Sequence, residues 1–240
     1  MRRETQHVLL VLLGGALLRI AADDTYLRYV RPSHRWLLIA AGVVIVTLAV
    51  VALVRDLRDR GPESDGHALT DCGHGDQGAA ERHVPWLLLA PVLVIALVAP
   101  PALGADSVTR AGARNAVVRD GDVFPPLAPN AELTVAEFVQ RAAWDTSGSL
   151  DGREVTLTGF TVRRGAAVEL ARLTIACCAA DARPHRIRLV GDLGDPPQDI
   201  WLRVRGTVQS GSATAATGYV PALTVSTAEV VAAPPDPYEY

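Results

Sequence analysis

Two adjacent cysteines are the residues of this sequence whose types and spacing best fit chemistry. Cys177 and Cys178 are followed by Asp181, and His185 comes four residues later. Thiolate, carboxylate and imidazole groups bind zinc and similar ions, so these four residues predict a metal site. A second interpretation is a redox-active disulfide between the two neighbours, which would be strained and easily reduced. A third is packing, because free cysteine is among the most buried residue types.

A weaker set of metal ligands lies in residues 55–84, which are rich in Gly, Asp and His and have no apolar periodicity. This composition predicts a flexible loop. Its candidate ligands are His67, Cys72, His74 and His83. Their spacing matches no closed zinc site, so a solvated linker is the favoured interpretation. A divalent metal such as zinc is the cofactor that either set would take.

The region that must carry these residues begins with three long apolar stretches. A helix needs about 20 mostly apolar residues to cross a bilayer, and three stretches qualify, at about residues 5–22, 36–54 and 85–105. We therefore predict a transmembrane region over residues 1–105 and a multi-pass protein of the cell membrane. The alternative for the first stretch is a secretory signal peptide that is cleaved before Asp23.

The arginines near the predicted spans favour neither side of the membrane, with six in the inner and six in the outer segments. Arg2 and Arg3 precede the first apolar stretch, which indicates a cytoplasmic N-terminus. Three spans then place the C-terminal domain outside the cytoplasm.

The remainder of the chain predicts a linker over residues 106–130 and a mainly-β soluble domain over residues 131–240. A short helix should open with Thr134 as its N-cap, since Glu137 follows three residues later. Adjacent strand residues point to opposite faces, so a bulge or turn is expected at Cys177 and Cys178. The domain resembles a five-stranded OB-fold barrel, with strands at about residues 154–162, 168–176, 185–190, 200–209 and 222–231.

Charge and motifs exclude two classes of function. The net charge is −3, and the predicted strands hold only two aromatic residues, Phe160 and Trp201. A nucleic-acid reader would need a basic groove lined by aromatic side chains, so nucleic acid is not an expected partner. The sequence also has no nucleophile–base pair, Gly-rich phosphate loop or HExxH spacing, so we do not predict an enzyme.

Two short runs resemble a known family. They are Pro-Pro-Ala-Leu-Gly-Ala at residues 100–105 and Cys-Cys-Ala-Ala-Asp-Ala at residues 177–182. Together with the apolar stretches they resemble the YcgQ-like bacterial membrane proteins, from the first span to the terminal Pro-Asp-Pro-Tyr-Glu-Tyr. The resemblance implies a partner, a larger multi-span permease in the same membrane.

The resulting prediction is an accessory subunit of a membrane permease, anchored in the lipid bilayer, whose OB-like domain docks or presents substrate. The alternative is a stand-alone membrane protein that senses metal or redox state through Cys177, Cys178 and Asp181.

Overall fold

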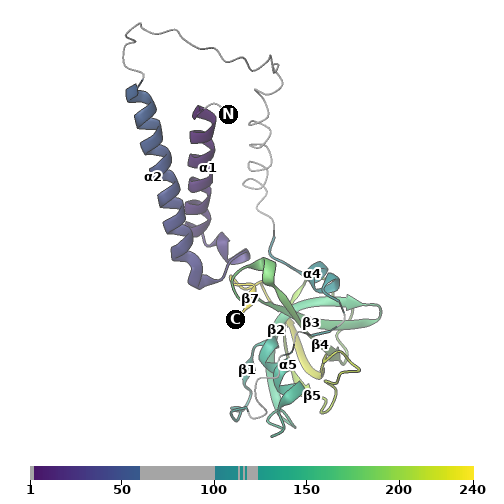
Figure 1. Ribbon diagram of the computed structural model, residues 1–240. Helices are drawn as coiled ribbons and strands as arrows, with labels where there is room; N and C mark the ends of the chain where they lie inside the picture. Colours follow the sequence, from purple (N-terminus) through teal and green to yellow (C-terminus); the bar gives the residue numbers. More distant parts are fainter. Residues whose placement is uncertain (1–2, 60–100, 113, 116, 118–123) are drawn as a thin grey trace. The chain divides into compact units, whose positions relative to one another are not determined.

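The computed structural model describes residues 3–59, 101–112, 114, 115, 117 and 124–240 (Figure 1). Two compact units can be separated within them. The first holds the N-terminal helices, and the second holds residues 27–31 together with the chain from Ala102 onward.

The first unit is a pair of helices, α1 (Arg3–Ala22) and α2 (Arg35–Asp59), which lie side by side in Figure 1. Glycines allow their close approach. A methyl group on Gly42 would lie 3.1 Å from the carbonyl oxygen of Gly14 and 2.9 Å from Leu18. Small residues at such crossings let helix backbones pack tightly.

One described helix is long and apolar enough, by length and composition, to cross a membrane. It covers Pro32–Arg58, which includes the predicted second span. The first predicted span corresponds to a shorter apolar helix, Gln6–Ala22. The third lies outside the described residues except at its end, where residues 101–104 have no regular secondary structure and Ala105 begins another helix.

The second unit is built on a mixed seven-stranded sheet in the order β1-β2-β5-β6-β4-β3-β7. An additional β2–β3 pairing joins five of these strands into a closed ring. The five strands predicted from the sequence are confirmed with shifts of one or two residues at their ends. The strands are β1 (Glu132–Leu133), β2 (Glu154–Arg164), β3 (Ala167–Thr174), β4 (Arg183–Val190), β5 (Trp201–Val208), β6 (Ala222–Val230) and β7 (Tyr238–Glu239).

Strand β2 closes the ring because it changes partner along its length. It pairs with β5 from Glu154 to Phe160 and with β3 from Phe160 to Arg164. Gly159 sits at the change, where a methyl group would lie 2.6 Å from the carbonyl oxygen of Ala171. Only glycine allows this close approach of the two backbones.

Helix α5 (Val135–Trp144) packs against the ring and supplies Phe138 and Val139 to its main apolar core. The predicted N-cap is confirmed, since the Thr134 hydroxyl accepts a hydrogen bond from the Glu137 N–H at 3.0 Å. The ring strands contribute most of the other residues of this core, Val155, Leu157, Leu170, Ile187, Leu189, Leu202, Val204 and Leu223.

The segment expected to be a linker contributes to the folded unit. Helix α4 (Ala105–Arg110) buries Ala105 and Val108 completely. They pack in a second apolar cluster with residues of β2 and β3 and with Tyr238 of β7. The Ala105 N–H donates to Asp199 Oδ1 at 2.6 Å, which fixes the start of α4.

Candidate thiol site

The two cysteines lie in a tight turn between β3 and β4. Strand β3 ends at Thr174, a 3-10 turn covers Ala179–Asp181, and β4 starts at Arg183. The predicted break of the strand at Cys177 and Cys178 is therefore confirmed. Alanines at 176, 179, 180 and 182 leave room for so sharp a reversal of the chain.

Asp181 holds the turn together from inside. Its Oδ1 accepts the Ala176 N–H at 2.7 Å, and its Oδ2 accepts the N–H groups of Cys177 and Cys178 at 2.8 and 3.2 Å. Hydrogen bonds from the Cys177 thiol and from these amides hold the pKa of Asp181 well below its ordinary value. A charged carboxylate that accepts three backbone bonds is a strong brace, so Asp181 positions the loop.

The two thiols are accessible and close to each other. Cys177 is exposed and Cys178 half-buried, and both are free. Their Sγ atoms lie 3.7 Å apart. The hydrogen bond to Asp181, with a smaller contribution from Cys178, raises the pKa of Cys177 to about 11. The thiol is thus protonated at neutral pH, and a metal ion would have to displace its proton.

The candidate metal ligands of the turn are Cys177, Cys178 and Asp181, whose ligand atoms all lie within 4.8 Å of one another. His185, the fourth predicted ligand, is not among them. Its side chain is buried, and its Nε2 lies 3.1 Å from the Thr174 hydroxyl. Burial lowers the pKa of His185 to about 4, so the imidazole is neutral. Strand β4 holds the His185 side chain in the interior, apart from these three residues, and its role as a ligand stays a prediction.

Two other predictions from the sequence meet different outcomes. Packing does not fit, because the exposed Cys177 fills no core. The weaker ligand set, His67, Cys72, His74 and His83, lies outside the described residues.

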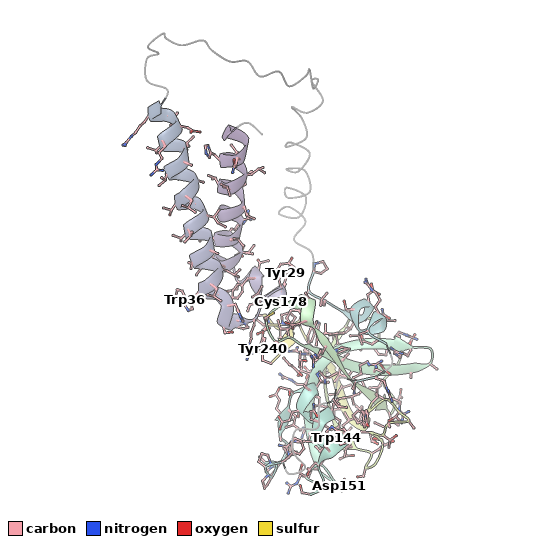
Figure 2. The ribbon with its side chains drawn as sticks, in the orientation of Figure 1. Tyr29, Trp36, Trp144, Asp151, Cys178 and Tyr240 are labelled. Carbon is pink, nitrogen blue, oxygen red and sulfur yellow. The ribbon has the colours of Figure 1, made fainter. Side chains whose placement is uncertain are left out.

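The residues that flank the turn could not be predicted from the sequence. Val30 forms an isolated antiparallel bridge with Cys178, and Tyr238 lies on the strand β7 beside β3. Figure 2 shows Tyr29, Cys178 and Tyr240 gathered in one region of the second unit. These residues are separated from the cysteines by up to about 150 positions along the chain. No local pattern predicts such a contact.

Replacing Asp181 with asparagine is expected to lower the pKa of the Cys177 thiol from about 11 toward its ordinary value of 9.0. The thiol would lose the carboxylate that accepts its proton and repels its thiolate. Thiol alkylation rates across a pH series, in a Cys72→Ser background, measure this change. Asp145→Asn is the matched control, because Asp145 braces the distant Ser147–Ser149 turn. An unchanged Cys177 titration in Asp181→Asn would contradict the assigned role.

Part of the chain is similar to a known protein family. No curated protein matches it. The YcgQ-like resemblance and the permease partner therefore stay predictions. One family model matches a stretch that runs from the end of α5 through all five ring strands and the thiol turn. Residues 141–240 of this chain are similar to the DUF1980 C-terminal domain.

Proposed function

We propose that this chain is a membrane-anchored accessory subunit of a permease whose C-terminal domain presents a thiophilic metal ion, such as zinc, on the Cys177–Cys178 pair. The observation that carries the proposal is the accessible pair of sulfur atoms, 3.7 Å apart on a braced turn. The rest of the domain supports the turn, since the ends of β3 and β4 fix both of its flanks.

The sulfur separation suits tetrahedral coordination. Two sulfurs 3.7 Å apart that each bind zinc at about 2.3 Å would subtend an angle of about 107° at the metal. The tetrahedral angle is about 109°, so the turn would need little rearrangement. Asp181 remains the brace in this arrangement because its oxygens already accept three backbone N–H groups.

Two thiolates leave about two of four tetrahedral positions open. Structural zinc sites fill all four positions with protein side chains, whereas sites that exchange or activate a ligand keep positions free. An ion held by Cys177 and Cys178 alone would be accessible to water or to donor groups of a partner. This supports presentation of the ion for transfer.

Separate observations support the membrane anchor and the OB-like fold of the domain. The apolar helix within Pro32–Arg58 supports membrane anchoring. The ring order β2-β3-β4-β6-β5, with β4 and β6 parallel and the other pairs antiparallel, supports an OB-like barrel. The permease partner and the extracytoplasmic location of the domain follow from the resemblance and from Arg2 and Arg3.

Zinc titration of the full-length chain in detergent, in a Cys72→Ser background, tests the metal site. One ion should bind per chain, and Cys177→Ser/Cys178→Ser should weaken binding by at least about 100-fold, since both sulfur ligands are lost. Affinity should rise with pH, because each thiol releases its proton on binding. Equal zinc affinity in the background chain and in the double serine variant would exclude the site.

Purification from native membranes in mild detergent tests the partner. A polytopic permease should co-purify with the chain, and a clean monomer would count against an accessory role. This result is independent of the zinc titration.

The second candidate function is redox sensing through the same pair. The exposure of Cys177 lets an oxidant reach this thiol, and because its pKa is raised to about 11, the reaction should speed up as the pH rises. A thiol count that falls by two with a mild oxidant, in a chain that binds no zinc, would support sensing over presentation.

A further inference from the structure

Residues 29–31 follow α1 in the chain yet pair with the thiol turn inside the second unit. Val30 bridges Cys178 in antiparallel fashion. The Arg31 N–H donates to the carbonyl oxygen of Cys177 at 3.1 Å, and the Ala179 N–H donates to the carbonyl oxygen of Tyr29 at 2.7 Å. We call residues 29–31 the strap. These two hydrogen bonds join the strap to the peptides on either side of Cys178.

Two C-terminal tyrosines contact the strap and the residue before it. The Tyr238 hydroxyl donates to the carbonyl oxygen of Arg28 at 2.8 Å and accepts the Leu103 N–H at 3.3 Å. The Arg31 guanidinium lies over the Tyr240 ring at 5.0 Å. The C-terminal tyrosines thus hold Arg28, just before the strap, and Arg31 at its end, whereas the thiol turn bonds the main chain of Tyr29 and Arg31.

We infer that the strap reports the chemical state of the cysteine pair: a metal ion on the pair retains it and a disulfide within the pair releases it. Only the part of this inference that concerns a bound metal ion rests on the proposed function. The inference assigns residues 29–31, which join α1 and α2 in the chain, a regulatory role at the thiol site.

Oxidation changes the geometry of the Cys177–Cys178 peptide, to which the strap is hydrogen-bonded. A small external disulfide accepts two electrons and both thiol protons and leaves as two thiols, and Cys177 Sγ bonds to Cys178 Sγ. The sulfurs must close from 3.7 Å to about 2.0 Å. Adjacent Cα atoms lie about 3.8 Å apart across a trans peptide, below the usual 4.4 Å minimum for disulfides. The peptide between the cysteines must distort, and it contains the Cys177 carbonyl that accepts from Arg31.

Metal binding needs no such closure, because the sulfurs already stand at a separation that fits tetrahedral coordination. The Cys177 carbonyl then keeps its alignment with the Arg31 N–H. A bound ion also restricts the motion of the turn, so the strap should open less often. The two states of the pair therefore act on the strap in opposite directions.

Hydrogen exchange of the full-length chain in detergent, in the Cys72→Ser background, tests the inference. Three states are compared: reduced, zinc-loaded, and oxidised with oxidised glutathione. The peptide covering residues 27–31 should exchange at least about tenfold faster after oxidation and about threefold slower with zinc. The amide of Phe138 in α5, which donates to Thr134, should not change.

A matched pair of variants gives a second readout through zinc affinity. Arg31→Pro removes the N–H that donates to Cys177, whereas Arg31→Ala keeps that N–H and removes only the contact with Tyr240. Coupling is reciprocal, so Arg31→Pro should weaken zinc binding by about fivefold or more relative to Arg31→Ala.

The outcomes separate the two proposals. In one outcome, the chain binds zinc with no change of hydrogen exchange in residues 27–31 and with equal affinity in both Arg31 variants. This result overturns the regulatory role of the strap and leaves the proposal of metal presentation unaffected. Absence of zinc binding overturns metal presentation. Faster hydrogen exchange of residues 27–31 on oxidation would then still support release of the strap by the disulfide. Equal hydrogen exchange of residues 27–31 in the reduced and oxidised chains contradicts the regulatory role of the strap, whether or not zinc binds.

Discussion

Replacing Glu239 with alanine is expected to destabilise the C-terminal unit by about 3–5 kcal/mol, because it leaves a buried charge without its partner. Glu239 is 7% exposed, and its Oε1 lies 3.5 Å from Nε of Arg172, which is also buried. Its two carboxylate oxygens accept the N–H groups of Val135 and Ala136 at 2.9 Å each. These are free amides of the first turn of α5, where a negative charge is also favoured by the helix dipole.

Burial raises the pKa of Glu239 and lowers the pKa of Arg172, so each charge depends on the other. Glu239→Gln keeps an acceptor for the α5 amides and should lose less stability than Glu239→Ala. The double variant Arg172→Met/Glu239→Met should recover part of the loss, since it removes both charges.

Urea unfolding of the full-length chain, followed by the near-ultraviolet signal of the C-terminal unit, measures these differences. Glu229→Ala is the matched control, because Glu229 is exposed on β6. A loss below about 1 kcal/mol in Glu239→Ala would contradict the assigned role of the pair.

Replacing Asn115 with alanine is the second large effect, with an expected loss of about 2–4 kcal/mol, because buried groups left unpaired cost about 1–3 kcal/mol each. The Asn115 amide donates to the carbonyl oxygens of Arg186 and Tyr219 at 2.9 and 2.8 Å, and its Oδ1 accepts the Arg186 N–H at 2.8 Å. The substitution leaves all three backbone groups without their partner.

The same unfolding measurement checks Asn115→Ala. Gln209→Ala is a suitable control, since it removes an amide that is exposed and makes one hydrogen bond, to Thr224. The control should stay within about 0.5 kcal/mol of the unsubstituted chain. Equal stability of Asn115→Ala and Gln209→Ala would show that Asn115 is not part of the fold.

The elements of the domain could be predicted because their patterns are local. Strand alternation gave β2 to β6 nearly to the residue, and the Thr134–Glu137 spacing gave the start of α5. Gly159 was recognised only as part of a strand. Its role at the ring closure depends on the approach of Ala171, which no short window contains.

The parts that were missed depend on distant partners. Residues 106–130 contain Pro and Gly and look like a connection, yet Val108 and Asn115 are held by β-strand residues many positions away. The strap meets the thiol turn, and Tyr238 meets Arg28, in the same way. Contacts of this kind follow from the three-dimensional arrangement, because a sequence pattern reports only what neighbouring residues prefer.

The candidate site was predictable in its chemistry and less so in its geometry. The adjacent cysteines and Asp181 could be singled out by residue type, and the break in the strand followed from the alternation of side chains. The roles within the set were not separable: Asp181 braces the turn through backbone amides, and His185 faces the interior. Both distinctions depend on which way a side chain points.

X-ray absorption at the zinc edge is the most direct test of metal presentation. The full-length Cys72→Ser chain, loaded with one equivalent of zinc, should show about two sulfur ligands at about 2.3 Å and about two lighter ligands at about 2.0–2.1 Å. Cys177→Ser/Cys178→Ser should lose the sulfur shell completely. A spectrum of the unsubstituted pair with only nitrogen and oxygen ligands would contradict the proposal that Cys177 and Cys178 hold the ion.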